Sequence, residues 1–207
     1  RSSTRCSSVR LASSRRSSLR RRSSIRRWSD PRIASRSRAR WPISSCWLVS
    51  IEAGAEAGRW HLDERMMLAV TATDPDGEPL GTWRALNEAV VEKWSSGHTV
   101  SLQVRIDGEP FTSYAADGLI VSTPTGSTAY SLSARGPIVS PKHRALLVTP
   151  VAPHMLFDRS LVLDPSETVE IDVLGEREAS IAIDGVPVRR LAPGAIVHCV
   201  PSDETAR

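Results

Sequence analysis

The sequence predicts a mainly β protein, in which short antiparallel strands build a multi-stranded, sandwich-like domain with one or two short helices. Three observations lead to this fold class. Hydrophobic and polar residues alternate from Thr99 to Asp107, which is the period of a half-buried strand. Two Asp-Gly pairs, Asp107-Gly108 and Asp184-Gly185, are typical of tight hairpin turns. Further short apolar runs follow one another with turn residues between them, a spacing typical of antiparallel all-β folds.

An Arg/Ser-rich tail, residues 1–49, precedes this domain. Residues 1–40 hold 14 arginines, 13 serines and one acid, Asp30, giving +13, and the 13 basic and 22 acidic residues that follow give −9. We predict that the tail is disordered, because it contains too little apolar area to offset the entropy of ordering. An organelle transit peptide, a nucleic-acid-binding arm and a wrong-frame translation of a GC-rich gene all fit its composition, and we favour the last.

The domain is predicted to span residues 50–207, with its first strand at Arg65 to Thr73 and a turn after it at Asp74 to Gly77. The apolar run from Ala85 to Trp94 fits a strand or a short helix equally well. Thr99 to Asp107 is the clearest strand, and the turn at Asp107-Gly108 leads to a partner strand at Phe111 to Ala115.

A buried strand is predicted at Gly118 to Thr123, where the apolar run ends at Pro124. A helix with a hydroxyl cap is predicted at Ser127 to Ala134. The remaining short runs predict strands at Leu146–Thr149, Ser160–Leu163, Thr168–Leu174, Ala179–Ile183, Val186–Leu191 and Ala195–Val200.

Composition excludes several classes of protein. A hydrophobic content of 40 % is enough for a packed core and excludes a wholly disordered or collagen-like chain. No apolar run approaches the roughly 18 residues of a membrane span. The three cysteines, Cys6, Cys46 and Cys199, are too far apart for a CxxC metal pair or a disulfide framework. A reducing, cytoplasmic location fits them best.

The segment from Asp117 to Tyr130, DGLIVSTPTGSTAY, is the densest candidate for chemistry. A strand, a Pro-Gly-hydroxyl loop and a helix start would place free backbone N–H groups and the hydroxyls of Thr125, Ser127 and Thr128 around one cavity. Such a place suits a phosphate or the hydroxyls of a ribose, and Asp117 could accept hydrogen bonds from a sugar or an amide. A capped helix that follows a strand, with Tyr130 half buried, explains the same shape without a ligand.

The amino-acid sequence of this segment and of several others resembles that of the NAD kinase family. Members of that family phosphorylate the 2′-hydroxyl of NAD with a nucleoside triphosphate or polyphosphate. The main likeness is Thr123 to Tyr130 (TPTGSTAY), followed by Ser133 and Gly136-Pro137. It extends in order from about Gly58 to Val200 through four more blocks: Ala85–Glu88, Thr149–His154, Arg159–Leu163 and Asp184-Gly185. The resemblance implies a domain of the type that family members carry at their C-terminus, which supplies most of the NAD-binding surface.

By that likeness, Asn87 and Glu88 would bind the ribose and adenine edges of NAD, and Asp117 would contact the nicotinamide half. His98 would reach NAD across a subunit boundary, although a solvent-exposed loop histidine is an equally good interpretation. The other nucleotide half would be lined by residues of the loop and first helical turn: Thr128, Ala129, Tyr130, Ser131, Leu132 and Ser133. Ala115, Arg135 and Val186 depart from the family pattern, which often has a basic residue, a glycine and a glutamine there.

The largest departure is the lack of the family's Gly-Gly-Asp-Gly-Thr turn, whose aspartate is the general base. The resemblance implies ATP, Mg²⁺ or another divalent metal, NAD as substrate, and a homodimer or homotetramer without membrane or nucleic acid. We therefore expect an NAD kinase chain that binds NAD and transfers phosphate poorly or not at all. One alternative is a non-catalytic dinucleotide-binding module with a nucleic-acid-binding tail. A distant lipid kinase relative is another, but the TPTGSTAY string favours the dinucleotide branch.

Overall fold

The computed structural model describes residues 62–207. The predictions for the Arg/Ser-rich tail lie outside these residues, as does the predicted start of the domain at residue 50.

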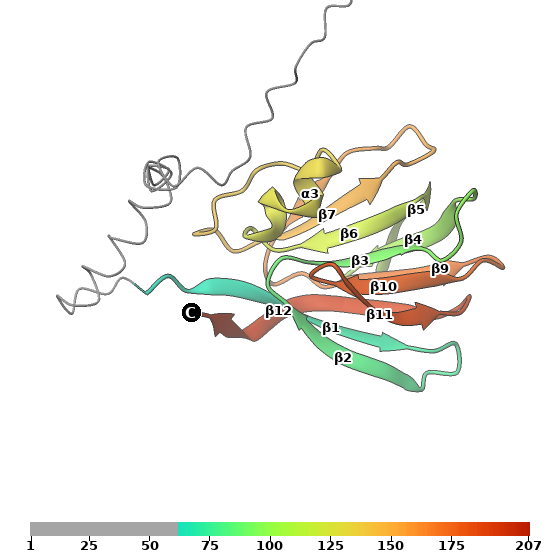
Figure 1. Cartoon of the computed structure of the whole chain (residues 1–207), viewed down its shortest axis with the longest axis horizontal. Coiled ribbons are helices and arrows are strands. Elements are labelled where there is room, and N and C mark those ends of the chain that lie inside the picture. The colour runs from blue at the N-terminus through green and yellow to red at the C-terminus, as the bar shows by residue number, and fades with distance from the viewer. Residues whose placement is uncertain (1–61) are drawn as a thin grey trace, which may run out of the picture. The chain divides into compact units, whose positions relative to one another are not determined.

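Twelve strands and two short helical turns make up the described residues (Figure 1). The first six strands are β1 (Arg65–Thr73), β2 (Pro79–Ala85), β3 (Glu88–Lys93), β4 (Val100–Ile106), β5 (Glu109–Ala116) and β6 (Gly118–Ser122). A 3₁₀ turn, η1 (Gly126–Thr128), and a one-turn helix, α3 (Tyr130–Ser133), come next. The last six strands are β7 (Leu146–Val151), β8 (Leu161–Leu163), β9 (Val169–Leu174), β10 (Ala179–Ile183), β11 (Val186–Leu191) and β12 (Ile196–Ala206).

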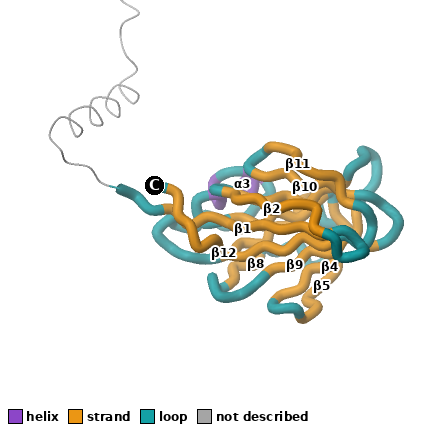
Figure 2. The backbone as a smooth tube through the Cα atoms, turned by 90° about the horizontal axis from the view of Figure 1, so that it is seen from below, coloured by secondary structure: helices purple, strands orange, loops and turns teal. Residues whose placement is uncertain are grey.

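These strands form two six-stranded antiparallel sheets, ordered β2-β1-β12-β9-β4-β5 and β11-β10-β3-β6-β7-β8. Side chains from both sheets share one buried core, with Leu68 and Leu102 from the first sheet and Val91 and Ile181 from the second. Figure 2 shows β1, β12, β9 and β4 side by side in the first sheet, with β10, β11 and α3 beyond them. The predicted mainly β, antiparallel sandwich is confirmed.

The second sheet has an outer face that the short helical segment partly covers. Val90, Ile120 and Ala182 form a small buried cluster on this face, and Ala134 and Val151 pack against it. Glu88 belongs to the same face, because side chains two residues apart along a strand point to the same side. The polar residues of the candidate site gather on this face.

The helix predicted from Ser127 to Ala134 is wrong in extent and in its cap. The segment divides into η1 and α3 at Ala129, whose φ of −94° and ψ of −127° are not helical. Neither N-cap residue, Thr125 for η1 or Ala129 for α3, makes a side-chain cap bond. Ser127 is buried, and its hydroxyl bonds to the backbone of Pro124 and Val139 rather than to its own helix.

Strand β2 was not predicted from the sequence. It lies at the edge of its sheet and most of its residues are exposed or half exposed, so it has no run of buried side chains to reveal it. The run from Ala85 to Trp94, for which a strand and a short helix were equally good predictions, contains strand β3. The last strand was predicted too short: β12 continues to Ala206, which pairs with Arg65 of β1.

Candidate functional site

The predicted ligand residues lie at the two ends of one central strand, β3. Its first residue, Glu88, is opposite Ser122 of β6, and Glu92 near its other end is opposite Gly118. The backbone N–H of Lys93, the last residue of β3, donates to the carbonyl of Asp117 at 2.9 Å. At the rise of an extended strand, Glu88 and Lys93 are about 16 Å apart. Such a span suits a long, extended ligand rather than a compact one.

Tyr130 connects these two ends. Its backbone N–H lies close enough to the Glu88 carboxylate to lower the pKa of that group. Burial raises the pKa of the Tyr130 hydroxyl, and the charges of Glu92 and Asp117 raise it further. One residue of the short helix therefore has its backbone at Glu88 and its ring toward Asp117. The structure thus brings together three predicted site residues that come from three separate segments.

Glu88 is the most buried acid of the site, with 5 % of its surface exposed. Its Oε2 atom has no hydrogen-bond partner among the described residues. Burial raises the pKa of Glu88 most, the nearby charge of Asp184 raises it further, and the Tyr130 N–H opposes both. An unpaired, buried carboxylate oxygen is costly in a folded protein, so a ligand hydroxyl or N–H would be a favourable partner for it.

Two cavities flank Tyr130. One of about 270 Å³ is lined by Glu92, Asp117 and Gly118 among others. A second, of about 580 Å³, is lined by Ser133, Arg135 and other residues of the helical segment and of the chain around β7. Tyr130 and Val151 line both cavities. The predicted residues Asp117, Tyr130 and Ser133 thus surround adjoining spaces on the outer face of the second sheet.

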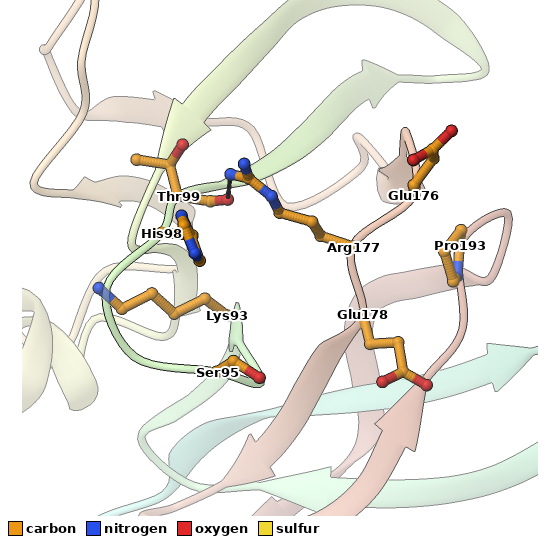
Figure 3. Close-up of a pocket in the computed structure, with 8 residues that line it drawn as sticks. All are labelled: Lys93, Ser95, His98, Thr99, Glu176, Arg177, Glu178 and Pro193. Carbon is orange, nitrogen blue, oxygen red and sulfur yellow. Dashed lines mark hydrogen bonds between the residues drawn. The ribbon is translucent and has the colours of Figure 1, made fainter.

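Lys93 separates this site from a third cavity of about 410 Å³ (Figure 3). Its ammonium group pairs with the Asp117 carboxylate at 2.6 Å. His98 lines this third cavity together with Thr99 and Arg177, whose guanidinium donates to the Thr99 carbonyl at 2.8 Å (Figure 3). The structure therefore places His98, an exposed loop residue, in a different cavity from that of Asp117, and not with Asn87 and Glu88.

Several hydroxyls of the TPTGSTAY segment bond inward instead of lining a cavity. The Ser127 hydroxyl donates to the Pro124 carbonyl at 2.7 Å, and that of Thr128 to the Thr125 carbonyl at 3.3 Å. Ser131 is fully buried, and its hydroxyl lies 3.1 Å from that of Thr149. The hydroxyl protons of Ser127 and Thr128 are therefore used within the segment, with Ser127 buried and Thr128 exposed. The neighbouring Ala129 is half buried, whereas Leu132 is 43 % exposed.

Sequence reasoning missed the role of Asp184 and Thr123, which hold the backbone of the Asn87 segment. The Asp184 carboxylate accepts hydrogen bonds from the N–H groups of Leu86, Asn87 and Glu88. These residues are 96 to 98 positions away in the chain, so no local pattern could have revealed the contact. The Asp-Gly pair indicated a turn, and the turn is present.

No cluster of metal-ligating side chains is present among the described residues. Residues 62–207 contain no group of three or more His, Cys, Asp or Glu side chains placed to hold a metal ion. We therefore assign none of them to the metal that the family resemblance implies. Within the same residues, no helix is both long and apolar enough to cross a membrane.

Fold and site together define a β-sandwich domain with a polar candidate site on the outer face of its second sheet. Residues 86–207 match the family model of the ATP-NAD kinase C-terminal domain. The match covers more than half of the chain, so the protein belongs to this family.

Curated relatives have similar sequences. The NAD kinase of Gemmatimonas aurantiaca is 44 % identical over 148 residues, which cover 69 % of this chain and 51 % of the relative. The NAD kinase of Desulforamulus reducens is 47 % identical over 118 residues, or 57 % of this chain and 41 % of the relative. The chain thus spans about half the length of the curated relatives it matches.

Solved structures have the same fold. The crystal structure of yeast NADH kinase complexed with NADH is 33 % identical, with a TM-score of 0.69 over 74 % of this chain and 45 % of that chain. An NAD kinase from Archaeoglobus fulgidus in complex with ATP is 24 % identical, with a TM-score of 0.60 over 76 % of this chain and 58 % of that chain. This second likeness concerns the fold alone.

Proposed function

We propose that this chain provides the NAD-binding domain of an NAD kinase, the enzyme class that phosphorylates the 2′-hydroxyl of NAD to give NADP. Membership of the ATP-NAD kinase C-terminal family supports the enzyme class. The observation that carries the assignment of the site is the arrangement along β3. Asn87 and Glu88 lie at one end, Asp117 lies at the other, and Tyr130 connects Glu88 with Asp117.

Each of these side chains has chemistry that suits a dinucleotide. The Asn87 amide both donates and accepts hydrogen bonds, as the edge of an adenine or a ribose requires. Glu88 has a buried, unpaired carboxylate oxygen that would accept from ribose hydroxyls. Asp117 would accept from the carboxamide of the nicotinamide half, since only one of its oxygens is paired with Lys93. Tyr130 would provide a flat wall between the two halves, because its ring is 40 % exposed.

Phosphoryl transfer requires parts that we do not find in this chain. The reaction depends on a correctly placed nucleophile and on neutralised phosphate charge. The Gly-Gly-Asp-Gly-Thr string does not occur in the 207 residues. ATP and Mg²⁺ or another divalent metal belong to the proposed parent reaction, with ATP as phosphoryl donor, and we assign no described residue to either. We propose that the chain by itself binds NAD and transfers phosphate poorly or not at all.

We further propose that copies of the chain associate as a homodimer or homotetramer in the cytoplasm. Large apolar side chains such as Ile138, Leu156 and Val186 are exposed in the single chain, and association would cover such surface. A reducing compartment fits Cys199, which is a free and buried thiol.

Calorimetric titration of the full chain with NAD tests the proposal. We expect saturable binding by the parent chain. Asp117→Asn removes the negative charge of the carboxylate proposed to accept from the ligand, so its dissociation constant should be at least tenfold higher. Asp164→Asn, in an exposed turn outside the cavities, is the matched control and should bind like the parent. A folded parent chain that releases no heat with NAD would overturn the proposal. Formation of NADP from ATP and NAD by this chain would contradict its second part.

A further inference from the structure

The segment that carries the proposed ligand residues, Leu86 to Glu88, has a partner for every one of its backbone polar groups. Its three N–H groups all donate to one carboxylate, that of Asp184. Leu86 donates to Oδ2 at 2.8 Å, while Asn87 and Glu88 donate to Oδ1 at 2.8 and 3.0 Å. The N–H of Asp184 returns a bond to the Glu88 carbonyl at 3.0 Å. Asp184 thus accounts for four of the six backbone groups.

Thr123 holds the other two groups from the opposite side. Its hydroxyl donates to the Leu86 carbonyl at 2.6 Å, and its N–H donates to the Asn87 carbonyl at 2.9 Å. Gly126 lies against the same carbonyl, so closely that a Cβ there would be 2.1 Å from the Asn87 oxygen. The segment is therefore fixed between the ends of β10 and β6, the two strands that flank β3 in the sheet.

The arrangement goes beyond what an Asp-Gly hairpin turn needs. The other such turn, at Asp107, has a similar left-handed backbone, with φ of 52° against 45° for Asp184. The Asp107 carboxylate accepts a single backbone N–H, that of Thr168, at 2.7 Å. Asp184 accepts three consecutive N–H groups, and they belong to the segment proposed to bind NAD. Hydrogen bonds to an ionised acceptor are stronger than neutral ones, so this contact is an effective way to fix a backbone.

We propose that Asp184 is a positioning residue for NAD: it fixes the backbone of Leu86 to Glu88 and so orients the side chains of Asn87 and Glu88 toward the dinucleotide. This inference rests on the proposed function for its ligand, but not for its structural part. Asp184 acts through the backbone and does not itself bind the ligand. A ligand group held in place before binding costs less entropy to use, so loss of Asp184 should weaken NAD binding without removing any group that touches NAD.

The structural part is tested by hydrogen exchange on the full chain. In Asp184→Asn, one of the two carboxylate oxygens is replaced by an NH₂ donor, and we expect the amides of residues 86–88 to exchange at least tenfold faster while the core strands stay protected. Asp107→Asn is the matched control and should leave these amides unchanged. Unchanged exchange in Asp184→Asn would overturn the proposal, whether or not the parent chain binds NAD.

The functional part is tested by NAD titration of Asp184→Asn, Asn87→Ala and the double variant. We expect Asp184→Asn to raise the dissociation constant at least tenfold, and the loss in the double variant to be smaller than the product of the two single losses, because part of the effect of Asp184 is exerted through the Asn87 side chain. Losses that multiply would show that Asp184 acts independently of Asn87 and would overturn the proposal. Asp184→Glu, which keeps the charge but displaces its oxygens, should behave like Asp184→Asn, and normal binding by Asp184→Glu would also overturn it. Failure of the parent chain to bind NAD counts against the proposed function instead.

Discussion

Glu88 combines a buried position with an ionisable group, and the two conflict. It is 5 % exposed and one of its carboxylate oxygens has no partner among the described residues. Burial and the charge of Asp184 both raise its pKa. A protein that keeps an acid in such a place loses stability whenever that acid ionises. The cost is acceptable if the same carboxylate oxygen binds a ligand.

The stability of the domain should therefore depend on pH through Glu88. A carboxyl group whose pKa is higher in the folded than in the unfolded chain contributes fully to stability below the unfolded pKa, which is near 4.5. That contribution is lost as the pH rises through the folded pKa. Glu88→Gln cannot ionise, so we expect its free energy of unfolding to increase relative to the parent between pH 4 and pH 8. Urea unfolding at both pH values measures this, and an equal difference at the two values would contradict it.

At the residue scale, the sequence indicated candidate ligand side chains but not the residues that hold their backbone. Asn87, Asp117 and Tyr130 stand in short strings that can be read locally. The backbone contacts of Asp184 connect positions almost a hundred residues apart, and only the folded sheet brings them together. At Arg135, the departure from the family pattern could be read from the sequence, but the backbone conformation could not. The structure gives it a φ of 67°, a conformation that favours glycine, which is the residue the family pattern has there.

At the element scale, the segment from Thr123 to Ala134 differs most from its prediction. Hydroxyl residues suggested a capped helix, but the buried Ser127 hydroxyl instead connects two parts of the loop. It donates to the Pro124 carbonyl and accepts from the Val139 N–H at 3.0 Å. Side-chain to backbone bonds of this kind compete with helix formation. The segment therefore forms two short helical turns instead of one helix, and the bond to Val139 holds the chain that follows them.

Two neighbouring hydroxyls of this segment should differ in their effect on stability. Ser127→Ala removes the partner of the half-buried Val139 N–H and one of the two hydrogen bonds to the buried Pro124 carbonyl, so we expect a loss of about 1–3 kcal/mol. Thr128→Ala removes only a 3.3 Å bond at an exposed position and should change stability by less than about 0.5 kcal/mol. Denaturant unfolding of both variants makes the comparison, and equal losses would show that the inward bond of Ser127 is not important.

Most strands were predictable because their residues alternate or form buried runs, as β1 and β4 show. Strand β2 was not predicted because it lies at the edge of its sheet, and an exposed strand has little hydrophobic pattern. The extension of β12 to Ala206 was missed for a similar reason. Its last residues, from Asp203 on, are exposed or half exposed, and Thr205 and Ala206 pair with β1.

At the scale of the whole molecule, the buried core that both sheets share is built from residues between Met66 and Cys199. The Arg/Ser-rich tail, residues 1–49, contributes a charge opposite to that of the chain that follows. We continue to propose that the folded domain lies within residues 50–207. The charge of +13 over residues 1–40 then says little about the ligand of the domain.

Removal of residues 1–49 tests this division of the chain. Because the described core lies entirely beyond them, we expect the midpoint of thermal unfolding of residues 50–207 to stay within about 2 °C of that of the full chain. NAD affinity, measured in parallel, should also be unchanged. A large drop in the midpoint would show that the first 49 residues belong to the domain.

The pairing of the first described strand with the last has a consequence for the order of events during synthesis. β1 pairs with β12 along its whole length, although more than a hundred residues lie between them. At typical rates of translation, β1 leaves the ribosome on the order of ten seconds before its partner. During that interval one edge of β1 is open, and the first sheet cannot close. A chaperone that covers open strand edges would therefore find a binding site at β1 on the nascent chain.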